Sequence, residues 1–166
     1  MLRSSRAELF AASALGKVGR SADGLQLVEN ALRRNGETGE KEHEAEFHRL
    51  LGELLLTEKG NNDEADRAFR TAIDVARRQR VKSWELRATT SLERLLAKQG
   101  KRDEARAMLA DICNWFTEGF DTADFKDAEA LLDQECRYAT SPKSLRTLSQ
   151  ATDEHIQDPT QPRQGG

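Results

Sequence analysis

The sequence predicts an all-α fold in which antiparallel helix pairs stack into a solenoid, with about three pairs and a C-terminal capping helix. One local pattern recurs three times at a nearly constant interval, the composition is rich in Ala, Leu, Glu, Arg and Lys, and glycines separate the amphipathic segments. A repeat period between roughly 20 and 50 residues is typical of helical arrays, in which each pair buries its apolar face against the next.

Each copy of the pattern has a glycine, then a small residue, then an apolar residue, and then a second small or aliphatic residue. The opening glycines, Gly19, Gly60 and Gly100, lie 41 and 40 residues apart. The copies are Gly19/Gly24/Val28/Ala31, Gly60/Ala65/Phe69/Ala72 and Gly100/Ala105/Leu109/Ile112. A small residue allows two helices to approach and the apolar residue one turn later fills the gap, so each copy predicts the second helix of a pair.

Glycine favours the left-handed turn that ends a helix, and Asn or Asp caps the next helix, as Asn62 and Asp103 are expected to do. We therefore expect helices at about residues 6–18, 22–34, 41–58, 63–79, 83–99, 102–117 and 122–138, with Gly36 and Gly39 separating the second from the third. One repeat domain is expected over residues 1–139. Residues 140–166 are rich in Pro, Gln and Gly and poor in large apolar groups, which predicts a disordered tail.

Charge and composition argue against several classes of partner. The net charge of −3 provides no basic surface for nucleic acid or anionic lipid, and no apolar run is long enough to cross a membrane. Cys113 and Cys136 are expected to be reduced thiols of a cytoplasmic protein, the alternative being a disulfide between them. The N-terminal residues could also be interpreted as a secretory signal, but they are needed for the first helix.

No constellation of catalytic residues can be argued. The sequence lacks the Gly-x4-Gly-Lys-[Ser/Thr] phosphate loop, and a cyclase carboxylate pair has no identifiable counterpart. His43 and His48 are five residues apart and do not share a helix face, so neither a metal site nor a cofactor is expected. These observations predict a protein that binds and does not catalyse.

The repeats resemble the tetratricopeptide repeat, in which a Leu-Gly step precedes Ala-x3-Phe-x2-Ala. Here Leu51-Gly52 precedes Ala65, Phe69 and Ala72, although the period near 40 exceeds the usual 34 residues. Glu93 stands where the repeat prefers a small residue, so Glu93→Ala is predicted to stabilise the fold.

A closer resemblance covers about residues 40 to 133. It is carried by residues 44–56 (EAEFHRLLGELLL), 76–79 (ARRQ) with 82–88 (KSWELRA), and 115–122 (WFTEGFDT). These segments resemble the C-terminal repeat region of bacterial predicted signalling ATPases, which are often joined to a class III adenylate or guanylate cyclase domain. The resemblance implies a helical interaction or sensor module detached from a larger protein. The alternative is that the chain is associated with the ATPase or cyclase activity of that parent.

The inner curve of such an array is the expected site for a protein or peptide partner, or for a neighbouring domain of a parent protein. By register, the candidate groove residues are Arg49, Glu53, Arg87, Thr90 and Arg94, with Arg6, Ser13 and Glu46 on the same face. Arg49, Arg87 and Arg94 could form a cationic strip that captures an acidic segment. The alternatives are plain solvated surface, or pairing of the arginines with Glu53 and Glu93, which would neutralise the strip.

Two other surfaces leave alternatives open. Trp115, Phe116 and Phe120 are expected to close the last helix pair against Phe125 and Leu132, although an exposed aromatic anchor is the other interpretation. The truncated first repeat leaves one end of the array without a cap, which makes self-association possible.

Overall fold

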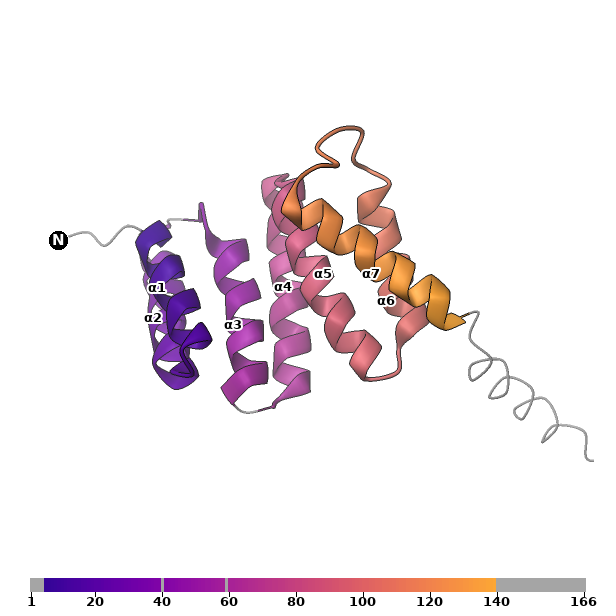
Figure 1. Cartoon of the computed structure of the whole chain (residues 1–166). Helices are drawn as coiled ribbons and strands as arrows, with labels where there is room; N and C mark the ends of the chain where they lie inside the picture. Colours follow the sequence, from indigo (N-terminus) through magenta and orange to yellow (C-terminus); the bar gives the residue numbers. More distant parts are fainter. Residues whose placement is uncertain (1–4, 40, 59, 140–166) are drawn as a thin grey trace, which may run out of the picture.

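The computed structural model describes residues 5–39, 41–58 and 60–139, and within these ranges the chain forms seven α-helices and no strand (Figure 1). They are α1 (Ser5–Lys17), α2 (Ser21–Thr38), α3 (Glu44–Glu58), α4 (Asn62–Gln79), α5 (Lys82–Lys98), α6 (Arg102–Cys113) and α7 (Ala123–Ala139). The all-α prediction is confirmed, whereas the predicted tail at 140–166 lies outside the described residues. None of these helices is long and apolar enough to cross a membrane.

Several predicted boundaries were wrong for local reasons. Gly36 does not end α2, because the left-handed turn falls at Gly39, with φ at 75° and its N–H donating to the carbonyl of Asn35. Helix α4 is capped by Asn61 and not by Asn62, since Asn61 Oδ1 accepts a bond of 3.2 Å from the amide of Glu64. Helix α6 ends at Cys113 and begins after Lys101, so Asp103 lies inside its first turn and does not cap it.

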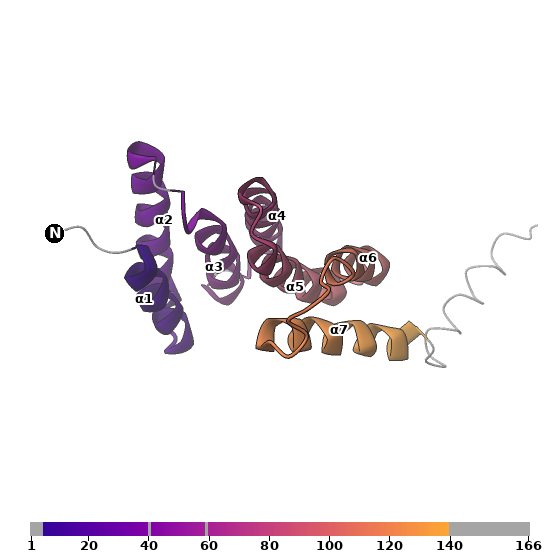
Figure 2. The same cartoon turned by 90° about the horizontal axis from the view of Figure 1, so that it is seen from above.

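The packing pattern places the odd-numbered helices on one side of the row. Each helix packs on its neighbours in the chain, and in addition α1 contacts α3, α3 contacts α5, and α5 contacts α7. Among the described residues, α2, α4 and α6 make no such contacts with one another. Helix α7 crosses α5 and α6 on the same side of the row as α1 (Figure 2). The odd-numbered helices therefore contact one another in succession along one side of the row, which we call the inner side.

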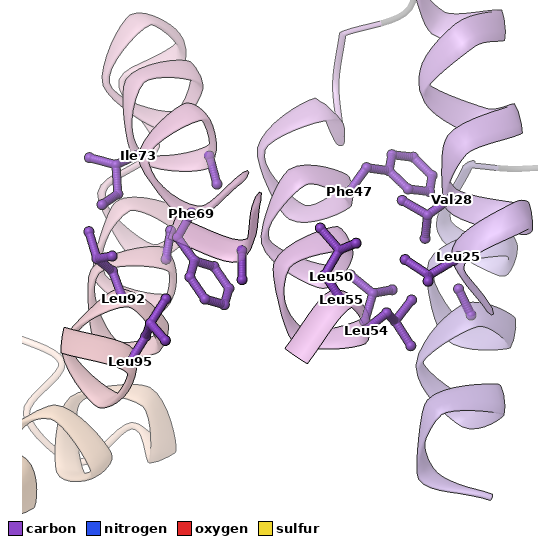
Figure 3. Packing of buried hydrophobic residues seen from close by; sticks show 14 of the residues in the cluster. Leu25, Val28, Phe47, Leu50, Leu54, Leu55, Phe69, Ile73, Leu92 and Leu95 are labelled. Carbon is purple, nitrogen blue, oxygen red and sulfur yellow. The ribbon is translucent and has the colours of Figure 1, made fainter. Parts of the chain in front are cut away.

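A continuous apolar core runs through α1 to α6. Phe47 of α3 faces Val28 of α2, Leu54 of α3 lies near Leu25, and Phe69 of α4 lies near Leu95 of α5 (Figure 3). The small residues of the repeat pattern are all buried, because they lie where helices approach closely: Gly24, Ala31, Ala65, Ala72 and Ala105. Gly52 shows how close this approach is, since a Cβ atom there would lie 2.5 Å from the Phe69 ring.

A second apolar cluster packs α7 against α5 and α6. Phe125 and Ala128 of α7 pack against Leu86, Leu109 and Ile112. The rings of Phe116 and Phe120 lie with their centroids 5.8 and 5.0 Å from that of Phe125, and Phe116 and Leu132 are partly buried in the cluster. The expected closing role therefore holds for Phe116. Trp115 and Phe120 are 58% and 51% exposed, and Trp115 lies in the turn beyond α6.

Candidate binding groove

Adjoining cavities hollow the inner side of the row, and together they form the surface that we call the inner groove. Their volumes are about 210, 370 and 170 Å³, and successive cavities share lining residues such as Ser13 and Arg87. The structure brings together every residue that the sequence placed on this face. Those lining residues are Arg6, Ser13, Glu46, Arg49, Glu53, Arg87, Thr90 and Arg94.

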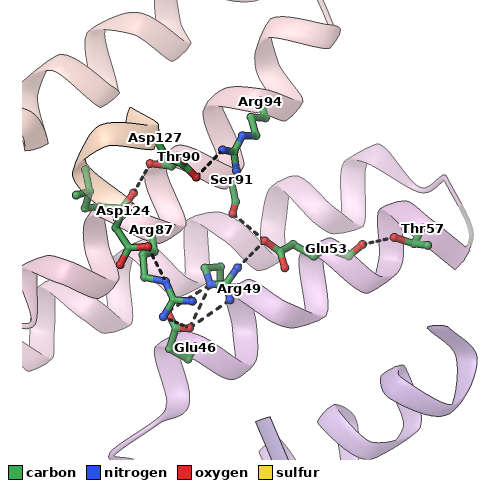
Figure 4. Close-up of polar contacts among 11 residues, drawn as sticks. Glu46, Arg49, Glu53, Thr57, Arg87, Thr90, Ser91, Arg94, Asp124 and Asp127 are labelled. Atoms are coloured by element: carbon green, nitrogen blue, oxygen red, sulfur yellow. Dashed lines mark hydrogen bonds and ion pairs between the residues drawn. The ribbon is translucent and has the colours of Figure 1, made fainter. Parts of the chain in front are cut away.

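One end of the groove, which we call the α7 half, is the 170 Å³ cavity between α3, α5 and α7. Arg94 Nη2 lies 3.3 Å from Asp127 Oδ2, and Arg87 Nε lies 3.6 Å from Asp124 Oδ1 (Figure 4). Helix α7 therefore supplies two carboxylates to the arginines of α5. Sequence reasoning missed both aspartates because it treated α7 as a cap and not as a wall of the groove. Their spacing of three residues on one helix was the available signal.

Glu46 of α3 pairs with two arginines at the centre of the groove, Arg49 of α3 and Arg87 of α5. Its carboxylate lies 2.8 Å from Arg87 Nη1 and accepts a 3.3 Å bond from Arg49 Nε. Arg49 also donates to Glu53, whose Oε1 accepts a 3.2 Å bond from Ser91 (Figure 4). Because Glu46 is buried and the Arg49 side chain is only 13% exposed, this part of the network is a fixed element of the fold.

The predicted cationic strip is neutralised in this half. Three guanidinium groups, those of Arg49, Arg87 and Arg94, face four carboxylates. The carboxylates belong to Glu46, Glu53, Asp124 and Asp127, and Glu53 pairs with Arg49 within α3 and not across neighbouring helices. Thr90 lines the cavity, but its hydroxyl donates to the carbonyl of Leu86 within α5.

The 370 Å³ cavity between α1, α3 and α5, which we call the open half, has different chemistry. Phe10 is 67% exposed, and the guanidinium of Arg6 lies 5.9 Å from the centre of its ring. Trp84 is half-buried against His43, with ring centroids 5.7 Å apart. Sequence reasoning selected polar residues by register and therefore missed these aromatic side chains, which line the same cavity.

The remaining titratable groups of interest lie outside the groove. Burial lowers the pKa of His48, and Arg78 of α4 adds to this effect while Glu44 partly opposes it. Burial also raises the pKa of the Cys113 thiol, and Glu129 raises it further, so Cys113 favours the unreactive protonated form. Within the described residues, no group of three or more His, Cys, Asp or Glu side chains is arranged to hold a metal ion. The chemistry that the groove itself offers is therefore ion pairing and contact with apolar side chains.

Comparisons with family models, curated proteins and solved structures find no match for this chain. The resemblance to tetratricopeptide repeats and to the signalling ATPase family therefore rests on the residues quoted above.

Proposed function

We propose that the chain is a non-catalytic protein-interaction module of the tetratricopeptide type, in which the inner groove holds a segment of a protein partner. The observation that carries the proposal is the convergence of polar side chains from α1, α3 and α5 on one hollowed face. Concave faces of helical arrays present such groups to extended partners. Binding sites also combine apolar walls with a few polar groups, as the open half does.

The repeat architecture supports this proposal. The period of about 40 residues, the packing of each helix on its neighbours and the contacts between successive odd helices are features expected of helix pairs stacked as a solenoid, and they support this interpretation. In this interpretation α1/α2, α3/α4 and α5/α6 are the three pairs and α7 is the capping helix. The resemblance to signalling ATPases extends the proposal to a cytoplasmic module detached from a larger bacterial protein.

Site-specific photo-crosslinking in the native host tests the proposal. A crosslinking residue at Ser13 or Thr57 lies in the groove without removing an ion pair, whereas Glu29 and Asp74 are exposed positions on α2 and α4 that line none of the three cavities. We expect one defined partner segment, identified by mass spectrometry, to crosslink from the groove positions and not from the outer positions. Equal crosslinking from both sets would contradict the proposal.

A further inference from the structure

The two halves of the inner groove differ in how far their arginines are neutralised. The open half is lined by Arg6, Arg49 and Arg87 but by one carboxylate, that of Glu46, which already pairs with both Arg49 and Arg87. Arg49 and Arg87 pair further with Glu53 and Asp124, so among the described residues Arg6 is the arginine of this lining that has no carboxylate within ion-pair distance. A cation without a partner in a concave surface attracts carboxylates.

Arg6 is the group in this half that is available for a ligand. Its side chain is exposed, and within the described part of the chain no carboxylate lies within ion-pair distance of it. Its interaction is with the face of the Phe10 ring. A guanidinium that is held over an aromatic ring keeps its donors free for bidentate bonds to a carboxylate.

An apolar wall lies beside these charges. Leu9, Phe10, Leu50 and Trp84 line the same cavity, and its volume of about 370 Å³ falls within the usual range of ligand sites. Phe10 exposes two thirds of its surface there, which favours contact with an apolar partner group.

The α7 half shows which kind of segment this surface accepts. Helix α7 places Asp124 and Asp127 on Arg87 and Arg94, while Phe125 between them is 7% exposed and packs on Leu86 and Leu109. An acidic segment with one apolar anchor is thus already bound by α5 within the chain. The open half has Arg6 in its lining, and no segment equivalent to α7 places a carboxylate on Arg6 among the described residues.

We propose that the open half binds an acidic segment of a partner protein that carries one large apolar anchor residue. A carboxylate of the segment pairs with Arg6, and the anchor contacts the wall that contains Phe10 and Trp84. This inference rests on the proposed function and names the chemistry of the partner.

Fluorescence anisotropy with the intact chain tests the inference. The probe is a labelled peptide, Glu-Asp-Glu-Ser-Phe-Glu-Asp-Glu, and the matched peptides replace every acid by Lys or the Phe by Ser. We expect the probe alone to bind, and more tightly at low than at moderate salt. Phe10→Ser should weaken binding by about tenfold and Arg6→Ala by about fivefold, which are typical effects for an aromatic anchor and a charged contact.

Two variants of exposed residues outside the open half provide controls. Val18→Ser removes a 70% exposed apolar side chain from the region just after α1, and Arg33→Ala removes an exposed guanidinium from α2, and both should bind the probe like the wild type. Circular dichroism of each variant shows that the helices are retained.

Several outcomes would overturn the inference. These are equal binding of the Lys peptide, unchanged binding by the Phe10→Ser variant, or loss of binding in Arg94→Ala but not in Arg6→Ala. Self-association in sedimentation experiments that Phe10→Ser abolishes would assign the surface to a second copy of the chain. If the probe fails while crosslinking from Ser13 persists, this inference fails and the proposed function stands, and failure of both would remove both.

Discussion

The two halves of the inner groove share α3 and α5, yet they differ in what faces their arginines. In the α7 half, Asp124 and Asp127 come from the same chain and neutralise Arg87 and Arg94. In the open half, α1 contributes Arg6 and Phe10 and no carboxylate that pairs with them among the described residues. The arginines shared by both halves are thus paired within the chain, and Arg6 is the groove arginine that has no carboxylate within ion-pair distance among the described residues.

The strength of these internal pairs differs as well. The side chains of Arg94 and Asp127 are 47% and 68% exposed, and ion pairs of this kind contribute at most about 1 kcal/mol. Arg49 is 13% exposed and its partner Glu46 is 8% exposed, so removing either would leave a desolvated charge. Helix α7 is thus held mainly by Phe125 and Ala128, whereas the centre of the groove is held by Glu46.

The largest expected effect comes from Gly52→Ala, which would disturb the packing of α3, the helix that lines both halves of the groove. The added methyl group meets the Phe69 ring within 2.5 Å, so α3 and α4 must separate. We expect a loss of about 1–3 kcal/mol in the free energy of unfolding, as for other overpacked cores. Gly36→Ala in α2 is the control, because a Cβ atom there meets nothing within 4 Å and Ala favours helix by up to about 1 kcal/mol. Urea denaturation with equal midpoints for the two variants would show that Phe69 can move aside.

Replacing Glu93 of α5 is expected to raise the free energy of unfolding, whereas Gly52→Ala is expected to lower it. Glu93 of α5 is 2% exposed, so its carboxylate is removed from water at a helix contact where the repeat prefers a small residue. Glu93→Ala should raise the free energy of unfolding by about 0.5–2 kcal/mol. Glu29→Ala on the exposed side of α2 controls for helix propensity and should change it by no more than a few tenths of a kcal/mol. A lower denaturation midpoint for Glu93→Ala would show that the buried carboxylate stabilises α5.

Much of the fold could be predicted because the repeat pattern reports packing directly. Ala65, Phe69 and Ala72 are fully or almost fully buried, since small and large residues alternate where α3, α4 and α5 meet. The exact helix ends could not be predicted in the same way. Gly36 lies inside α2 although glycine disfavours helices, because the turn depends on the φ angle of a different glycine, Gly39.

The candidate site could also be predicted in part, because residue spacing fixes the face of a helix on which a side chain lies. The spacing of Arg87 and Arg94 fixes their face of α5, and hence their place in the groove. Their partners on α7 depend on how the turn after Cys113 directs the next helix, which local pattern does not specify. The exposed Phe10 resembles a core residue in sequence, but in the structure it lines the open half of the groove.

A smaller effect is expected from Asp124→Asn combined with Asp127→Asn. Because both ion pairs are half exposed, the free energy of unfolding should fall by less than about 1 kcal/mol. Amide hydrogens of α7 should nevertheless exchange faster, and the arginines of the α7 half should become available to the acidic probe. Hydrogen exchange with mass spectrometry and the anisotropy titration measure the two effects. Asp111→Asn, at an exposed position of α6, is the control, and unchanged exchange in α7 would show that its apolar contacts alone hold it.

The smallest expected effect is a pH dependence of the free energy of unfolding. It is caused by His48 of α3, the helix that both halves of the groove share. His48 lies on α3 with Arg78 of α4 nearby, and burial, as the main cause, lowers its pKa below the ordinary 6.5. The unfolded chain therefore takes up a proton at a higher pH than the folded chain does. The free energy of unfolding should be constant above about pH 7.5 and fall as the pH drops through about 6.5. His48→Gln should flatten the urea midpoint between about pH 7.5 and 5.5, and equal slopes for wild type and His48→Gln would contradict this assignment.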